Sequence, residues 1–512
     1  MLIRKTFYSS IIQIGTNIAH VVFGLSLAYF FGASKDMDAY IASSNFIIAL
    51  NSLLVGSQRN SLIPFISKYR DNPQQKDIIA SIIKTNTLLF LLLSIIIFIF
   101  SKWIVIFLAP GLNPEQLAVS SKILKILSFY ILLSNMSGIG SAILDYQYKF
   151  EKRYLLTFFQ SLLAIGVLFF LVNKIGIYST PLAHIISLAI VTIFYITLFV
   201  KNGYVFKISL RLFNNYLKEY IYLLFPILIS WFFVWMIRFA DVFVASFLKT
   251  GSISYLSYCQ RINMYTSVIA NVICSIYFPI LSKLSSPENR KEFMRLFYNG
   301  FQALFTFSIA ISSFIFIFSY PITKILFERG HFLAEDTNVV SSVLKYYFFV
   351  LLCAPLGAYY ANTYYAYHKT KLAMLFSLIS SMVNIVLNVI LAFYYDVFGL
   401  AAASSIAFLV GNVLQLTNIR RVNPEYRIII LIRKSIAPLS AVAISVGIIF
   451  YIKSNWIGIP SYYSLKIYLI YIFIQACLFF LIFFSLCYLF RVKIIYDNIS
   501  KILFHFISKR KH

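Results

Sequence analysis

Charged residues are scarce in this chain of 512 residues: they make up 12% of it, whereas an average soluble domain carries about 25%. Hydrophobic residues make up 60%. Apolar runs of about 20 residues, the length that spans a bilayer as a helix, recur from end to end. This shortage of solvating surface excludes soluble multidomain, disordered and fibrous chains. The composition is that of a polytopic membrane protein.

Motifs for catalysis, metal binding and nucleotide hydrolysis are also missing. The five cysteines form no CxxC pair, so we expect neither a disulfide framework nor a zinc knuckle, and we interpret all five as buried, inert thiols. No GxxxxGK[ST] loop occurs, so nothing indicates an ATP-driven motor. We therefore expect no enzyme activity, no cofactor and no metal site. If the protein needs energy for its function, that energy should come from a gradient or a partner.

The apolar runs predict an all-α polytopic membrane protein of about fourteen transmembrane helices. Long apolar runs without alternation of period two exclude a transmembrane barrel. The predicted helices cover residues 8–31, 39–63, 80–101, 123–144, 154–173, 179–200, 219–247, 256–280, 298–320, 339–366, 372–395, 399–418, 434–452 and 466–490.

Positive charge is abundant, with 44 Lys and Arg against 17 Asp and Glu. In membrane proteins Lys and Arg concentrate in the cytoplasmic connections. With the N-terminus in the cytoplasm, 29 basic residues fall on the cytoplasmic side and ten on the opposite side. The basic composition therefore indicates a topology with both termini in the cytoplasm, and we expect no nucleic-acid partner.

Short segments recur along the chain. SLIPFISKY (61–69) is echoed by IYFPILSKL (276–284), 215 positions on, and YQYK (146–149) by AYHK (366–369), 220 positions on. Six helices per copy is an even number, so both copies enter the membrane in the same orientation, as in transporters with a central cleft. We predict an N-terminal six-helix lobe over 1–205, a parallel C-terminal six-helix lobe over 206–420, and two additional helices with a basic cytoplasmic tail over 421–512.

Four longer stretches carry family motifs: FFGASKDMDAY (30–40), DVFVASFLKTGSISYLSYCQRI (241–262), LFERGHFLAEDT (326–337) and VNIVLNVIL (383–391). In this order they resemble the MviN/MurJ family of the MATE-like multidrug/oligosaccharidyl-lipid/polysaccharide exporter superfamily. The resemblance covers nearly the whole chain. It implies a flippase that moves an undecaprenyl-diphosphate-linked saccharide, a lipid II-like peptidoglycan precursor, from the inner to the outer leaflet of the bacterial cytoplasmic membrane by alternating access. As partners it implies this cargo, membrane lipids, and glycosyltransferases or a polymerase of the same pathway.

The resemblance is incomplete in the first lobe. The family usually has arginines in helix 1 and near the middle of helix 2, where this chain has Asn17, Phe23, Asn51 and Ser52. Two alternatives therefore stay open: a flippase for an O-antigen, capsule or exopolysaccharide repeat unit, and a MATE-type drug/cation antiporter. The antiporter would need acidic cavity residues, which are few here. A membrane polymerase or ligase would need a long outer loop, which the chain lacks, and the repeat and buried arginines argue against a scaffold.

Charged side chains at membrane depth cost about 3 kcal/mol or more each, so they usually face a cavity or a partner. We predict a substrate-binding cleft lined by Arg261, Arg59, Arg238, Asp241, Asp38, Asn17 and Asn45. Arg238 and Asp241 share a helix face, either as a local ion pair or as a pair in the cavity. The seven-residue spacing of Asn45, Ser52 and Arg59 predicts one polar stripe.

Asp38 and Arg261 match positions of the family. Both could also be interfacial residues at the ends of their helices. The resemblance implies that Arg261 contacts the diphosphate of the cargo, and a planar guanidinium suits that group because it can form two parallel hydrogen bonds.

Overall fold

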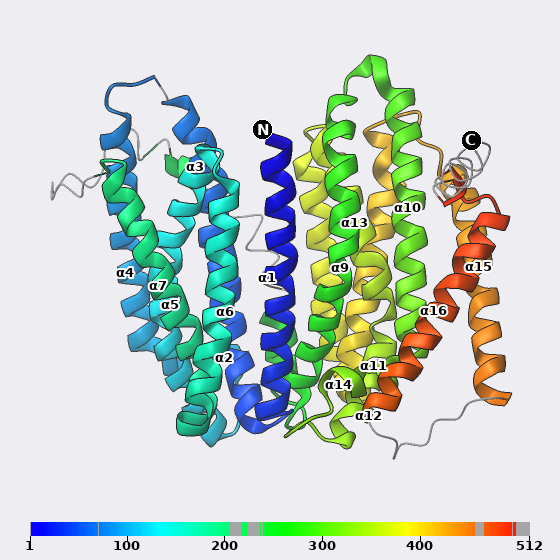
Figure 1. The fold of residues 1–512 in the computed structure, drawn as a ribbon, viewed down its shortest axis with the longest axis horizontal. Coiled ribbons are helices and arrows are strands. Elements are labelled where there is room, and N and C mark those ends of the chain that lie inside the picture. The colour runs from blue at the N-terminus through cyan, green and yellow to red at the C-terminus, as the bar shows by residue number, and fades with distance from the viewer. Residues whose placement is uncertain are drawn as a thin grey trace, which may run out of the picture. The chain divides into compact units, whose positions relative to one another are not determined.

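A computed structural model describes residues 2–69, 71–204, 239–455 and 465–493, together with 218, 220–222, 236 and 495–497. Within these residues every regular element is a helix. Ten helices there are long and apolar enough to cross a membrane, or eleven if the bent pair α12 (Ala334–Tyr346) and α13 (Phe348–Ala366) forms one span. The predicted all-α polytopic class is confirmed (Figure 1).

The observed helices follow the predicted apolar runs and extend most of them by a few residues. Besides α12 and α13, the described helices are α1 (Leu2–Phe31), α2 (Lys35–Asn51), α3 (Ser57–Lys68), α4 (Gln75–Leu108), α5 (Pro114–Tyr146), α6 (Phe150–Ile175), α7 (Ser179–Lys201), α9 (Ser252–Lys283), α10 (Arg290–Ile317), α11 (Ser319–Phe327), α14 (Thr370–Asn418), α15 (Ile428–Asn455) and α16 (Leu465–Leu489). The predicted helix over 219–247 lies mostly outside the described residues, so the count of fourteen stays a prediction.

Two of the ten spans are 52 residues long and each contains a backbone break. Gly176 (φ 55°, ψ −133°) ends α6, and Asp396 (φ 54°, ψ −140°) interrupts α14. Tyr148 and His368, just before these spans, have φ values of 55° and 57°. Residues other than glycine rarely adopt positive φ. Both pairs are 220 positions apart, so the backbone breaks recur at the offset of the sequence repeat.

Hydrogen bonds between helices recur at nearly the same offset. Thr192 donates to the Leu133 carbonyl, and 220 positions later Asn412 donates to the Cys353 carbonyl. Likewise Ser43 donates to the Ser120 carbonyl and Cys259 to the Val340 carbonyl, with donors 216 and acceptors 220 positions apart. The same packing solution therefore occurs twice along the chain, which supports the internal repeat.

The chain divides into two compact units. Unit 1 comprises Met1–Ser254 and Arg329–Phe332, and unit 2 comprises Tyr255–Glu328 and Leu333–His512. The short segment belongs to unit 1 because the His331 amide donates to the Tyr29 carbonyl at 2.9 Å. The predicted lobe boundary at 205–206 adjoins residues outside the described ranges, so the division at 205 and 420 stays a prediction.

In unit 1, α5 packs against α2, α3, α4 and α7, while α1 packs against α6. Glycines allow these close approaches. A Cβ atom on Gly140 would lie 2.1 Å from the ring of Tyr195 on α7, and one on Gly138 would lie 2.4 Å from Val55. Small residues of this kind let transmembrane helices pack closely.

In unit 2, α10 is the most enclosed span, with 78% of its apolar window buried. It packs against α13 and α15, and α15 packs against α16. In Figure 1, α15 and α16 form an antiparallel hairpin, so the start of α15 and the end of α16 lie at the same end. Four cysteines are buried as predicted. Cys477 on α16 is exposed, because that helix turns part of its surface away from the other helices of unit 2.

Candidate functional site

Arg261 lies on α9 of unit 2, a helix long and apolar enough to cross a membrane. It is the tenth residue of this helix, about 14 Å along its axis. The side chain is half-buried, and its Nε is enclosed without a hydrogen-bond partner among the described residues. An unpaired buried donor costs about 1–3 kcal/mol. Such a guanidinium suits a ligand that accepts hydrogen bonds and carries negative charge.

Tyr265 lies one helical turn after Arg261 and therefore on the same face of α9. Its hydroxyl oxygen is buried and lies within hydrogen-bond reach of the Arg261 guanidinium. Arg261 and Tyr265 together present one charged and one neutral donor side by side. Tyr265 is not among the cleft residues predicted from the sequence, although its spacing of four from Arg261 is a usable signal.

Asp38 is buried in unit 1, with 2% of its surface exposed. One carboxylate oxygen accepts from the Gly251 amide at 2.6 Å. The other accepts from the Ser254 amide at 2.9 Å and from the Ser254 hydroxyl at 2.6 Å. Asp38 therefore caps the amino-terminal end of α9, where unpaired amides and the helix dipole favour a negative charge.

Gly251 explains why this cap comes from a distant residue. It immediately precedes α9, in the position where Ser, Thr, Asp or Asn usually supplies a capping oxygen. Glycine has no side chain, so Asp38 supplies the oxygen from α2, 213 positions earlier. No local sequence signal links these two residues.

Asn17 and Asn45 occupy half-buried positions on α1 and α2 of unit 1. The Asn17 oxygen accepts from Gln13 Nε2 at 3.1 Å, one turn earlier on the same helix. This contact is local and leaves the Asn17 amide nitrogen available. The structure does not join Asn17 and Asn45 by a hydrogen bond.

The predicted polar stripe on helix 2 is altered by a π-helical turn. The turn η1 (Ser52–Gly56) lies between α2 and α3, and the Ser52 hydroxyl donates to the Ile48 carbonyl at 2.9 Å. A π-helix adds a residue to the turn, so a spacing of seven does not align Asn45 with Arg59 as it would on a continuous α-helix. Arg59 lies on α3, and its side chain is outside the described part.

The proposed pair on helix 7 is only partly described. Arg238 lies outside the described residues. Asp241 lies in a helical stretch of unit 1 and is buried, with 9% of its surface exposed. The ion pair between them stays a prediction.

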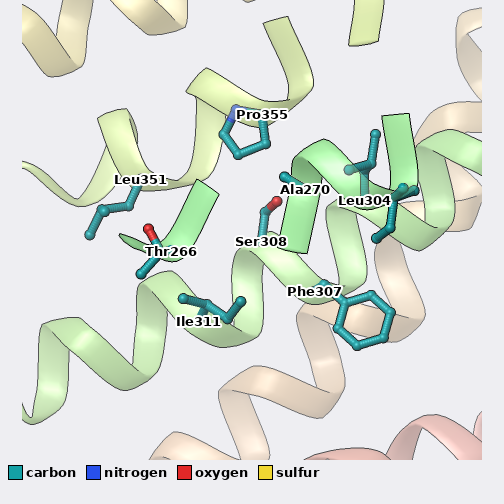
Figure 2. A pocket seen from close by; sticks show the side chains of 9 residues that line it. Thr266, Ala270, Leu304, Phe307, Ser308, Ile311, Leu351 and Pro355 are labelled. Carbon is teal, nitrogen blue, oxygen red and sulfur yellow. The ribbon is translucent and has the colours of Figure 1, made fainter. Parts of the chain in front are cut away.

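Figure 2 shows a pocket in unit 2 between α9, α10 and α13, where Thr266 and Ser308 are the polar lining residues. Apolar side chains complete it: Ala270, Ile273, Leu304, Phe307, Ile311, Leu351 and Pro355. Its enclosed space of about 10 Å³ has room for about one water molecule. It has no charged lining residue and cannot hold a diphosphate-sugar headgroup.

Comparisons with known proteins bear on this arrangement. A family model described as "Lipid II flippase MurJ" matches residues 27–483. A "Probable lipid II flippase MurJ" of Buchnera aphidicola subsp. Acyrthosiphon pisum is 26% identical over 426 residues, which are 81% of this chain and 83% of that protein. The "Lipid II flippase MurJ" of Thermosipho africanus is 26% identical over 417 residues, 81% of this chain and 84% of that protein.

Solved structures agree in fold. One described as "Lipid II flippase MurJ, inward closed conformation" matches with a TM-score of 0.82 at 23% identity, over 95% of this chain and 99% of that chain. An inward-facing multidrug resistance MATE family transporter of the MOP superfamily matches with a TM-score of 0.69 at 16% identity, over 80% and 96% of the two chains. The fold is thus shared with transporters, and because the family model covers most of the sequence, this chain belongs to the lipid II flippase MurJ family.

Proposed function

We propose that this chain is a flippase for lipid II or a close relative, an undecaprenyl-diphosphate-linked saccharide, which it moves from the inner to the outer leaflet of the membrane. A diphosphate-sugar headgroup cannot cross hydrocarbon unaided, because its charges and hydroxyls would lose their hydration. The protein must replace those lost contacts while the polyprenyl tail stays in lipid. No covalent step is needed, so we propose transport without enzyme activity or a cofactor.

The observation that carries this proposal is the donor pair on α9. Arg261 offers an enclosed Nε without a hydrogen-bond partner among the described residues, and the Tyr265 hydroxyl lies beside it on the same helix face. A guanidinium can bind a diphosphate through two parallel hydrogen bonds, and the phenol can donate a third. Arg59, Arg238, Asp241, Asn17 and Asn45 remain further members of the proposed cleft.

For Asp38 we propose a positioning role. Its two oxygens are already engaged by Gly251 and Ser254. Further contact with an anionic cargo would also be repulsive. By fixing the first turn of α9, Asp38 holds the amino-terminal end of the helix that carries Arg261.

The chain is a multi-span helical protein of the bacterial inner membrane, and we propose that both termini face the cytoplasm. The 29-to-10 division of basic residues supports this orientation. Alternating access would then expose the cleft first to the cytoplasm and later to the outside.

The proposal is tested by substituting Arg261. Arg261→Ala removes a charge-assisted partner of the diphosphate and should weaken precursor binding by about 2–4 kcal/mol. Arg261→Lys should keep part of the activity, because a point charge cannot form the two-pronged contact. Binding of purified lipid II to protein in detergent and complementation of a depleted strain are the measurements.

Arg295→Ala is the matched control, because Arg295 is an exposed arginine on α10 of the same unit. It should bind and complement like the original protein. If Arg261→Ala also does so at equal expression, Arg261 is an interfacial anchor and the proposed site is wrong.

A second cargo is favoured by one feature of helix 2. Asn51 and Ser52 stand where the family usually has arginines, and the Ser52 hydroxyl is bonded to its own helix. A less cationic first lobe would suit the repeat unit of a surface polysaccharide. Depletion of the protein, followed by identification of the lipid-linked intermediate that accumulates, distinguishes the two cargoes.

A further inference from the structure

A basic site at one end of the α15–α16 hairpin has no part in the proposed transport. Lys434 is half-buried on α15, at the seventh residue of the helix. Its Nζ donates to Asn299 Oδ1 at 3.2 Å and to Gln302 Oε1 at 3.1 Å, both on α10. Both partners are neutral amides. No carboxylate of the described residues forms an ion pair with Lys434, so its charge is partly desolvated and not neutralised.

The chain after α16 reverses direction sharply. Arg491 has a positive φ of 52°, and the Val492 amide returns to the Cys487 carbonyl at 2.9 Å. This six-residue closure with a left-handed residue is the Schellman pattern, which ends a helix and redirects the chain. Residues 492, 493 and 495–497 therefore do not continue the line of α16.

The redirected segment is held against unit 2 by apolar side chains. Val492 and Ile495, which are 1% and 8% exposed, join the same buried cluster as Leu431 of α15. Lys493 lies between these two anchors and is itself exposed. Its charge acts on Lys434. The fold thus places a second ammonium group at the same end of unit 2, close enough to interact electrostatically with the first.

Two like charges held together, one of them partly buried, are unfavourable unless an anion joins them. The position of Lys434 and the side chains near the reversal indicate which kind of anion binds there. Lys434 is about 9 Å along its helix from the first residue, within the first two turns of a candidate membrane span. Leu489 and Phe490, just before the reversal, expose 69% and 41% of their surfaces. A ligand there meets both cations and open apolar surface.

We propose that Lys434 and Lys493 bind the phosphate of an anionic phospholipid, whose acyl chains lie along the end of α16. The proposed topology places this end at the cytoplasmic leaflet, where juxtamembrane lysines attract anionic lipids. The site does not depend on the transport proposal, since binding of a phospholipid can be measured without lipid II. It would fasten the C-terminal hairpin to α10 through a lipid.

The experiment is native mass spectrometry of the full chain in detergent, titrated with phosphatidylglycerol, with phosphatidylcholine as the neutral comparison. Lys493→Gln and Lys434→Gln should each weaken phosphatidylglycerol binding about fivefold, and the double variant about thirtyfold. Lys434→Arg keeps the charge and should retain most of the binding. The matched control is the double variant Lys369→Gln/Lys371→Gln, since both lysines are exposed and lie in unit 2.

Lys493→Gln keeps the test valid if Lys434→Gln fails to fold, because Lys493 is exposed. Equal loss in the Lys369→Gln/Lys371→Gln variant would overturn the proposal, since binding would then follow total charge alone. Undiminished binding in the Lys493→Gln and double variants would also overturn it. A third arm adds inorganic phosphate: if it displaces the lipid at millimolar concentration, the site binds a free anion and the phospholipid assignment is wrong.

Discussion

Replacing Asp38 with alanine removes the cap of α9 without touching the helix itself. Asp38 accepts hydrogen bonds from the Gly251 amide, the Ser254 amide and the Ser254 hydroxyl at 2.6, 2.9 and 2.6 Å. The hydroxyl can rotate to another acceptor, but the two amides are fixed. Each unpaired buried donor costs about 1–3 kcal/mol, so loss of partners for the two amides should cost the variant about 2–6 kcal/mol of stability. With an unfolding entropy of about 2.1 cal/mol/K per residue over 512 residues, a loss of this size lowers the melting midpoint by roughly 2–6 °C.

The unfolding of each variant can be followed through the reactivity of the buried cysteines. Four of them become reactive only when the helices separate, so a thiol-reactive fluorophore reports unfolding. Cys477 is exposed and would react at once, so all variants are compared in a Cys477→Ser background. Asp38→Asn should fall between the original protein and Asp38→Ala, because it keeps one acceptor oxygen and places a donor against a donor.

Asp36→Ala is the matched control. Asp36 lies in the same first turn of α2 and is exposed, so only the helix-dipole contribution of about 0.3–1 kcal/mol is lost. If Asp38→Ala melts at the same temperature as Asp36→Ala, then the three hydrogen bonds do not stabilise this end of α9. The positioning role of Asp38 would then be refuted.

Three further results are expected. Arg421→Cys should be labelled by a membrane-impermeant thiol reagent only after the cells are opened. Labelling in intact cells would show that this connection lies outside and that the proposed orientation is wrong. Gly140→Ala should destabilise the protein by about 1–3 kcal/mol, since its Cβ would lie 2.1 Å from the Tyr195 ring. Gly166→Ala on α6 is its control, because that Cβ meets nothing within 4 Å and should leave the melting midpoint unchanged or raise it. In the transport assay, Arg261→Lys should lie between Arg261→Ala and the original protein.

The helical architecture could be predicted from the sequence because it depends on local hydrophobicity. An apolar run of about 20 residues has few alternatives in a membrane. The repeat was visible for a similar reason, since YQYK and AYHK mark the same backbone turn, with positive φ at Tyr148 and His368.

The candidate site was less accessible, because its geometry depends on distant parts of the chain. Asp38 could be recognised as unusual, yet its partners Gly251 and Ser254 lie more than 200 positions away. The π-helical turn at Ser52–Gly56 changes the angle around the helix axis between Asn45 and Arg59. No pattern in the sequence predicted this turn. Packing against α5, where Gly138 admits Val55, accompanies that turn.

The offset between Ser43 and Cys259, whose hydrogen bonds are equivalent in the two copies, is 216 positions. At this offset Arg261 corresponds to Asn45. A duplicated backbone therefore carries a cation in one copy and a neutral amide in the other. At this pair of equivalent positions the duplication preserved the backbone and not the charge, so in the proposed transport role the two copies would offer different partners to a headgroup with a charged diphosphate and neutral sugars.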